Sequence, residues 1–312
     1  MSNTLTFKSE KEYCSYRANL DFWWPHIITV LERHNLDVNQ CLLAECGFNP
    51  TYPVFLIADI VIKFFGHRPY WRGAFTSECV AHDYLTKDKS ILAPSILATG
   101  ELFPNTDLCW PYIISSKVPG RSWLDTTFTA AEKNNIAAEI GQQLRKIHEL
   151  PTDKRLQHDN KWSTLNFKMA AEKSVLPLHL VAQVDNFIAK LNDFDSCFVN
   201  SDMVATHIFI ENGHLSGIID WGDATVTDRH YELGKLLDTF NWDKELLKIV
   251  LNSANWPVKK NFAKQALGLA LYRQAVGLTQ HSSFDVFYKL PNLLPLEDIA
   301  TLEDLADILF GI

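Results

Sequence analysis

Residues 199–224, VNSDMVATHIFIENGHLSGIIDWGDA, constrain the fold most, because they combine a strong turn signal with two acidic residues. Asn212-Gly213 is a dipeptide that favours a tight two-residue turn between antiparallel strands. We therefore predict a hairpin with strands at 207–210 and 215–221. Asp202 lies just before this hairpin, and Asp220 lies near its end.

The register of the hairpin brings polar side chains together. A two-residue turn pairs His207 with Ile218, and it places Asp220 on the same face as His207, as a diagonal neighbour roughly 7 Å away. The polar loop around Asp202 lets its carboxylate face the same space. One cation could therefore contact both acids, and such a site suits a divalent metal and a nucleotide.

This block resembles the catalytic loop and the metal-binding segment of the aminoglycoside phosphotransferase family, which is related to the protein kinases. The resemblance implies that Asp202 orients the acceptor hydroxyl and takes its proton, and that His207 and Asp220 bind magnesium. The chain departs from the family in having Asn200-Ser201-Asp202 instead of His-Gly-Asp, and His207 instead of asparagine. The nitrogen ligand suits magnesium less well than an oxygen would.

Each of these residues also has an ordinary structural explanation. A lone aspartate after a strand is usually a cap or a turn residue, and a histidine in an apolar strand is usually a core or surface side chain. The loop, the hairpin and both acids agree with one site, so their conjunction favours catalysis.

A second apolar segment, residues 52–65, carries a lone cation. Ala58-Asp59 divides the segment into two short strands, and Lys63 is the only cation inside them. A buried ammonium needs a partner, and the resemblance implies that Glu78, in the helical segment 77–85, pairs with Lys63 and that both serve nucleotide binding. The alternative is an edge strand from which Lys63 reaches solvent.

Two further segments are assigned by the resemblance. Residues 46–53 would cover the phosphates, although they contain a single glycine. Residues 110–120 are predicted to form a strand that ends in a Pro-Gly turn, and the resemblance implies a hinge that contacts the purine. The purine-contacting residues would be Ser115, Ser116, Lys117 and Val118. Any other strand exit would give the same pattern.

Length and pattern indicate an α+β protein with two lobes. The 312 residues can form a sizeable core, and 47% hydrophobic and 21% charged residues are typical of a globular chain. The resemblance implies a protein-kinase-like fold, with a small mixed nucleotide-binding lobe at 1–115 and a larger, mainly helical lobe for catalysis and substrate at 116–312. Helices are predicted at 21–34, 130–150, 180–191, 231–240, 242–253, 259–279 and 296–309.

Charge and cysteine content narrow the class further. A net charge of −8 argues against nucleic-acid binding and is compatible with a cationic substrate, although it also simply aids solubility. The six cysteines include no C-x-x-C pair, so we expect reduced thiols. No signal peptide or membrane span is predicted, so we expect a cytoplasmic protein. The oligomeric state is not predicted.

The predicted activity is transfer of the γ-phosphoryl group of ATP or GTP, with Mg²⁺, to a hydroxyl of a small molecule, most simply an aminoglycoside-like acceptor. Asp223, Asp228 and Glu232 could meet a cationic acceptor, but for Asp228 we favour a cap of the helix that contains 231–237. The alternatives are a metabolic amino-alcohol or hydroxyamino-acid kinase, or a nucleotide-binding module without transfer activity.

Overall fold

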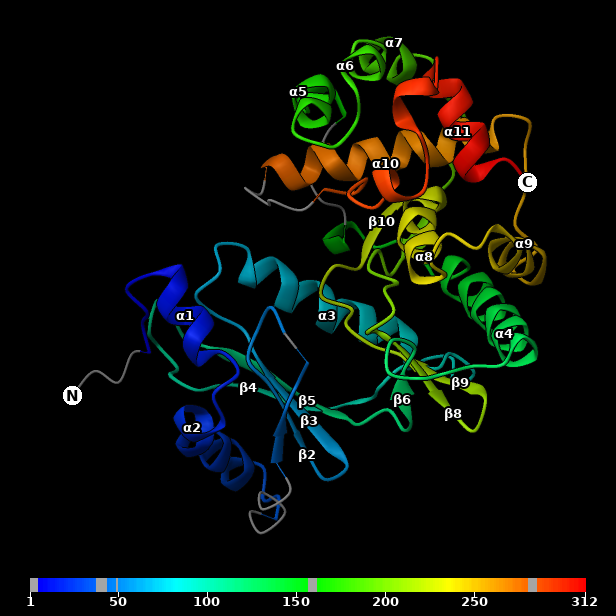
Figure 1. Ribbon diagram of the computed structural model, residues 1–312. Coiled ribbons are helices and arrows are strands. Elements are labelled where there is room, and N and C mark those ends of the chain that lie inside the picture. The colour runs from blue at the N-terminus through cyan, green and yellow to red at the C-terminus, as the bar shows by residue number, and fades with distance from the viewer. Residues whose placement is uncertain (1–4, 38–43, 49, 157–161, 280–284) are drawn as a thin grey trace. The chain divides into compact units, whose positions relative to one another are not determined.

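The computed structural model describes residues 5–37, 44–48, 50–156, 162–279 and 285–312 (Figure 1). The described residues form two compact units. The first runs to Thr126 and includes Thr206–Asp223, and the second comprises Thr127–Ala205 and Ala224–Ile312. The first mixes strands and helices and the second is mainly helical, so the predicted α+β class is confirmed. The roles predicted for 1–115 and 116–312 stay predictions.

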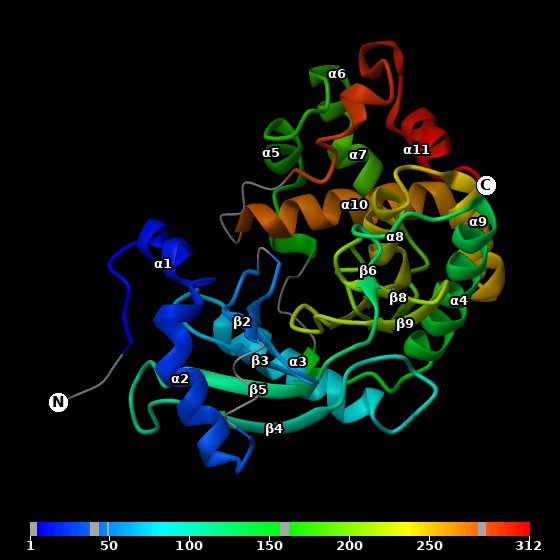
Figure 2. The same cartoon turned by 60° about the horizontal axis from the view of Figure 1, so that its bottom comes forward.

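The first unit is built on a five-stranded antiparallel sheet. Its strands lie in the order β1 (Ala44–Cys46), β2 (Val54–Ile57), β3 (Ile60–Phe64), β5 (Pro111–Ser116) and β4 (Ile96–Glu101). Three helices belong to the same unit: α1 (Glu10–Tyr16), α2 (Leu20–Arg33) and α3 (Trp71–Leu85). The views in Figures 1 and 2 place α2 and α3 on opposite faces of this sheet.

The alternation of side chains along β3 explains why both faces are covered. Ile62 and Phe64 pack in a core cluster with side chains of α2, while Phe65 packs in a second cluster with side chains of α3. Lys63 lies between Ile62 and Phe64 and is paired with Ile113, whose side chain belongs to the α3 cluster. Lys63 therefore projects from the central strand toward α3.

The two strands predicted in residues 52–65 are confirmed. Ala58 adopts a left-handed conformation, with φ of 49°, in the turn between β2 and β3. Because β3 pairs with β2 on one side and β5 on the other, the edge-strand alternative for Lys63 is wrong. The strand predicted within 110–120 is also present, as β5.

The hairpin predicted around Asn212-Gly213 forms, and its register agrees with the prediction at the two pairs next to the turn but not beyond them. Its strands are β8 (Ile208–Glu211) and β9 (His214–Ile218), and Ile208, not His207, pairs with Ile218. The pairing shifts between Phe209 and Ile210, which marks a β-bulge. The extra residue in β9 shifts the pairs that lie beyond the bulge, away from the turn, by one position.

The hairpin belongs to the first unit, whereas the predicted boundary placed it in the lobe at 116–312. Strand β6 (Arg121–Ser122) pairs with β8, and the N–H of Ile218 donates to the carbonyl of Leu92 over 2.8 Å. These backbone hydrogen bonds attach the hairpin to residues that precede it by about a hundred positions.

The second unit contains one two-stranded antiparallel sheet among its described residues, in which β7 (Ser196–Val199) pairs with β10 (Thr225–Asp228). Helix α4 packs on α9, and α10 packs on α5 and α11 (Figure 2). The α-helices are α4 (Ala130–His148), α5 (Phe167–Glu172), α6 (Leu178–Val181), α7 (Val184–Ile188), α8 (Leu233–Thr239), α9 (Lys244–Ser253), α10 (Phe262–Thr279) and α11 (Leu302–Phe310). Short 3-10 turns are η2 (Lys154–Leu156), η3 (Trp162–Thr164), η4 (Arg229–Glu232), η5 (Leu290–Asn292) and η6 (Leu296–Asp298).

Most predicted helices are present, with two changes. The segment 180–191 is interrupted between α6 and α7 at Gln183, whose side chain binds the carbonyl of Ala300 and the N–H of Leu302. The last helix begins later than predicted, because Thr301 and Asp304 form a capping box in front of it.

The structure bears on the cysteines and on membrane-spanning helices. Five cysteines are described and carry free thiols, while Cys41 lies outside the described residues. No described helix combines the length and apolar character needed to cross a bilayer. Asn49, in the segment predicted to cover the phosphates, lies outside the described residues as well.

A buried histidine on α3 gives the first unit a pH-dependent stability. Burial, together with the charge of Lys63, lowers the pKa of His82 to about 4. Because the unfolded value is about 6.5, the unfolded chain binds the proton more readily between these values. This contribution to stability is complete above pH 6.5 and is lost as the pH falls toward 4. We expect His82→Gln to reduce the stability difference between pH 7 and pH 4.5 by about 2 kcal/mol, measured by urea unfolding. An unchanged difference would mean that His82 does not titrate in this way.

Candidate active site

Lys63 is held between two carboxylates in the first unit. Its Nζ lies 2.6 Å from Oε2 of Glu78 on α3 and 2.9 Å from Oδ1 of Asp220, after β9. The side chains of Lys63 and Glu78 are 12% and 10% exposed, whereas that of Asp220 is 39% exposed. The predicted ion pair with Glu78 is therefore present, and Asp220 is a second partner that the sequence did not predict. The nucleotide-binding role of these residues stays a prediction.

The charges in this cluster support one another. Burial alone would lower the pKa of Lys63, but the carboxylates of Asp220 and Glu78 raise it, so Lys63 remains an ammonium. Burial would raise the pKa of Asp220, but the Lys63 ammonium and His207 outweigh it and hold that pKa well below its usual range. The cluster therefore presents a deprotonated, partly exposed carboxylate beside a fixed cation.

His207 reaches Asp220 although the predicted register is wrong. The N–H of Ile219 donates to the carbonyl of His207 over 3.0 Å, which continues the hairpin pairing past the strand end. Asp220 has a φ of 59°, a left-handed conformation that is uncommon for a residue other than glycine. Nε2 of His207 lies 3.7 Å from Oδ2 of Asp220.

The donor atoms at Asp220 fit a magnesium ion bound together with a phosphate ligand. Mg²⁺ is usually held by one or two carboxylates, with water and substrate phosphates completing its shell. Asp220 supplies an ionised carboxylate that is partly open to solvent. In the described part of the chain, no group of three or more His, Cys, Asp or Glu is arranged to hold an ion alone, so phosphate and water oxygens would be needed.

The predicted purine-contacting segment is partly occupied by its own hydrogen bonds. The N–H of Ser116 donates to the carbonyl of Ser95 over 2.9 Å, and the N–H of Lys117 donates to the backbone carbonyl of Asp59 over 2.8 Å. Ser115 is paired in the sheet, and Val118 is buried. The amides of Ser116 and Lys117 are therefore used within the fold, and a purine contact by these four residues stays a prediction.

Asp202 follows β7 in the second unit, in a loop whose backbone is fixed. Asn200 and Ser201 are buried, and the side chain of Asn200 accepts a hydrogen bond from the N–H of Asp202 over 2.9 Å. Ser201 has a φ of 69°, at the position where the family has glycine. The loop thus keeps a left-handed turn without a glycine.

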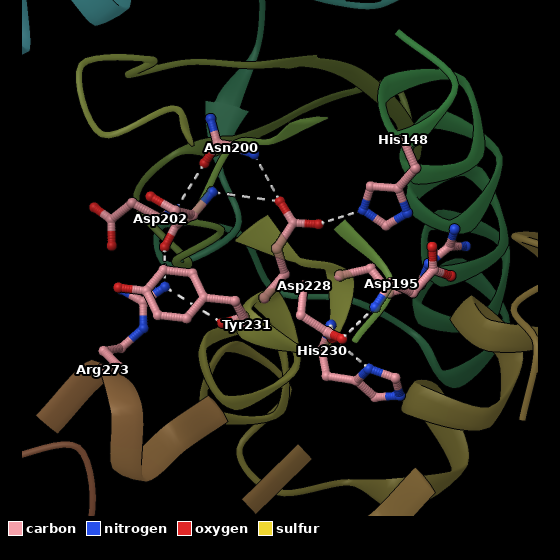
Figure 3. Close-up of polar contacts among 11 residues, drawn as sticks. His148, Asp195, Asn200, Asp202, Asp228, His230, Tyr231 and Arg273 are labelled. Carbon is pink, nitrogen blue, oxygen red and sulfur yellow. Dashed lines mark hydrogen bonds and ion pairs between the residues drawn. The ribbon is translucent and has the colours of Figure 1, made fainter. Parts of the chain in front are cut away.

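A fully buried carboxylate accepts hydrogen bonds from the backbone of this loop. Glu232, at the end of η4, accepts hydrogen bonds from the N–H of Asn200 over 2.8 Å and of Ser201 over 3.4 Å. Its other oxygen lies 2.8 Å from Nε2 of His148 on α4 (Figure 3). The burial of Glu232 shows that it supports the Asp202 loop and does not face a substrate, contrary to one predicted role.

Asp228 caps η4, as the capping alternative predicted. Its carboxylate accepts hydrogen bonds from the backbone N–H groups of His230 and Asp195 and lies 2.6 Å from Nδ1 of His230 (Figure 3). Burial would raise the pKa of Asp228, but these hydrogen bonds and His230 lower it. Asp228 is therefore a buried structural acid, whereas Asp223 is exposed and its substrate role stays a prediction.

Two cations beside Asp202 were not predicted. Arg273 on α10 donates to the carbonyls of Ser201 and Tyr231, and its guanidinium carbon lies 4.0 Å from the centre of the Tyr231 ring (Figure 3). Lys235 on α8 places Nζ 3.2 Å from Oδ1 of Asp202. A signal for Arg273 was available, since it interrupts a long apolar helix. Asp202 belongs to the second unit and Asp220 to the first, so their predicted convergence stays a prediction.

Comparison with known proteins agrees with this architecture. Residues 61–260 match the model of the phosphotransferase enzyme family, APH. The GDP complex of a point mutant of aminoglycoside 2'-phosphotransferase IIIa is similar, with 17% identity, 91% of this chain and 97% of that chain covered, and a TM-score of 0.66. The macrolide 2'-phosphotransferase MphH from Brachybacterium faecium shares 12% identity over 84% of this chain and 94% of that one, with a TM-score of 0.60.

A third structure, the ADP-bound aminoglycoside phosphotransferase APH(2'')-Ib, has 16% identity, covers 92% of this chain and 98% of its own, and gives a TM-score of 0.59. Similarity at this level of identity establishes the fold, which is the expected protein-kinase-like one. The family match covers more than half of the sequence and includes Lys63, Asp202 and Asp220. The chain therefore belongs to the phosphotransferase enzyme family, APH, whose members are small-molecule kinases.

Proposed function

We propose that this phosphotransferase moves the γ-phosphoryl group of ATP or GTP to a hydroxyl of an aminoglycoside-like small molecule. The observation that carries the proposal is the pairing of Lys63 with Glu78 and Asp220 in a partly exposed cluster. A fixed ammonium beside an ionised carboxylate is what phosphate and its metal ion require. The similar structures include complexes with ATP, GDP and ADP, and with gentamicin, streptomycin and kanamycin.

Each residue has one role in this proposal. Lys63, held in place by Glu78, binds phosphate oxygens of the nucleotide, and Asp220 with His207 would hold Mg²⁺. The bound ion would neutralise charge on the phosphates. Asp202 accepts a hydrogen bond from the acceptor hydroxyl, orients its oxygen toward the γ-phosphorus and takes the proton as the new O–P bond forms and the bond to the leaving diphosphate breaks. No phosphorylated enzyme is needed.

Binding of nucleotide and metal can be measured before any acceptor is known. We expect ATP or GTP with Mg²⁺ at 100 times its Kd to stabilise the wild-type protein by about 2.7 kcal/mol. Asp220→Asn should remove most of the magnesium-dependent part of this shift, because the amide carries no charge. Thermal unfolding with each nucleotide, with and without Mg²⁺, makes the comparison, and Asp185→Asn, in α7, is the matched control. An Asp220→Asn protein with wild-type metal dependence would overturn the ligand role.

A second candidate function is that of a metabolic kinase for an amino alcohol or a hydroxyamino acid, and one observation favours it. Of the three acids that could meet a polycation, Asp228 and Glu232 are buried and hydrogen-bonded within the fold. An amino alcohol or a hydroxyamino acid has one amino group, so it needs fewer exposed acids to bind than a polycation does. Nucleotide consumption with kanamycin, gentamicin, streptomycin, choline, ethanolamine and homoserine separates the two classes, and binding without turnover of any of them would favour a nucleotide-binding module.

A further inference from the structure

Lys235 makes an ion pair that the phosphotransferase assignment does not explain. It lies in the first turn of α8, where the helix dipole disfavours a cation. Its Nζ is nevertheless 3.2 Å from Oδ1 of Asp202, and the two side chains are 17% and 22% exposed. The pair is therefore shielded from solvent to a degree that gives it more effect than an ordinary surface salt bridge.

Three contacts of the Asp202 loop act on its backbone. Asn200 accepts from the N–H of Asp202, the N–H of Val204 donates to the carbonyl of Asp202, and Thr239 Oγ1 donates to the carbonyl of Met203. These hydrogen bonds fix the loop but leave the orientation of the carboxylate to side-chain contacts. The Lys235 ammonium is such a contact.

The charge of Lys235 also matters for the chemistry. Asp202 must approach a hydroxyl that attacks an anionic phosphoryl group, and two negative groups at close range repel each other. A cation beside Asp202 offsets that repulsion at the point where the reaction takes place. Three acids lie near Lys235 in the sequence. Glu232 and Asp228 are buried and bound to backbone N–H groups, and Asp238 pairs with Lys289.

We propose that Lys235 is a positioning residue, which orients the Asp202 carboxylate toward the acceptor hydroxyl and offsets its charge during phosphoryl transfer. This proposal rests on the proposed function of Asp202. It assigns Lys235 to Asp202, whose Oδ1 lies 3.2 Å from its Nζ, and not to nucleotide binding. The effect of removing Lys235 should therefore appear in turnover and not in the affinity for nucleotide.

The test compares Lys235→Met, Lys235→Arg and the control Lys248→Met. Lys248 pairs with Glu245 on the exposed side of α9, so its loss should change nothing. The reaction is Mg-dependent consumption of ATP or GTP with the best acceptor of the panel, and with water as acceptor if none of them is used. We expect Lys235→Met to lower kcat about 10- to 100-fold, because it removes a hydrogen bond to a charged group. The KM for the nucleotide should stay within about twofold of the wild-type value. Lys235→Arg should recover most of kcat.

The outcomes distinguish this proposal from the function on which it rests. A wild-type protein that consumes no nucleotide under any of these conditions contradicts the proposed function itself. An active wild type with an unchanged kcat in Lys235→Met overturns the role of Lys235. A fall in kcat that Lys235→Arg does not reverse, or that accompanies an equal rise in nucleotide KM, also overturns it, because a charge-specific role on Asp202 predicts neither.

Discussion

Asp202→Asn should lower kcat for phosphoryl transfer about 10²- to 10⁴-fold, the usual contribution of a general base. The amide keeps the size of the side chain and can still accept a hydrogen bond, but it cannot take the proton of the hydroxyl. The affinity for nucleotide should change little, because Lys63, Glu78 and Asp220 form their cluster in the other unit of the chain. Steady-state kinetics and a nucleotide titration measure the two quantities separately.

Asp195→Asn is a suitable comparison for this variant. Asp195 also lies in the second unit and pairs with Arg229 over 2.8 Å, away from the Asp202 loop. It should keep near wild-type kcat, so a fall confined to Asp202→Asn would identify the carboxylate itself. Turnover within threefold of wild type in Asp202→Asn would remove the base assignment.

Glu232→Ala should destabilise the second unit by about 3 kcal/mol or more and should also reduce activity. The substitution leaves the N–H groups of Asn200 and Ser201 and the ring of His148 without their buried carboxylate partner. Because these N–H groups fix the Asp202 loop, the loop should lose its orientation even in the molecules that remain folded. Urea unfolding gives the free energy, and kcat at a temperature well below Tm gives the catalytic effect.

Two variants make the Glu232 experiment specific. Glu232→Gln keeps an acceptor oxygen for the backbone N–H groups and should lose less stability than Glu232→Ala. Glu149→Ala removes an exposed acid that pairs with Arg145, and it should stay within about 0.5 kcal/mol of wild type. Equal stability of Glu232→Ala and wild type would show that the buried contacts are not important for the fold.

The parts of the fold that short-range chemistry determines were predictable from the sequence. The Asn212-Gly213 turn and the break at Ala58-Asp59 both lie where turn residues interrupt apolar runs. That Lys63 would have an acidic partner was predictable because a cation on a buried strand needs one, and the family resemblance indicated Glu78. The register of the hairpin was not, since the bulge adds a residue to β9, although Gly217 inside that strand was a signal of one.

The supports of Asp202 were not predictable from the sequence. Glu232 and Lys235 lie about thirty positions from the loop, and Arg273 about seventy. The packing of η4, α8 and α10 on one another brings them to it. An acid in a polar segment such as 223–232 has the same local pattern whether it is buried or exposed, so Glu232 could not be separated from Asp223, whereas capping chemistry already distinguished Asp228.

The central claim is that Asp202 promotes phosphoryl transfer to a small-molecule hydroxyl from a nucleotide bound at Lys63 and Asp220. Mass spectrometry of the acceptor panel after incubation with ATP or GTP and Mg²⁺ tests it most directly. The prediction is an acceptor heavier by one phosphoryl group, formed in equal amount to the nucleoside diphosphate, and absent with Asp202→Asn although that variant still binds nucleotide. Formation of the same product at the wild-type rate by Asp202→Asn, or tight nucleotide binding by the wild type with no phosphorylated acceptor, would contradict it.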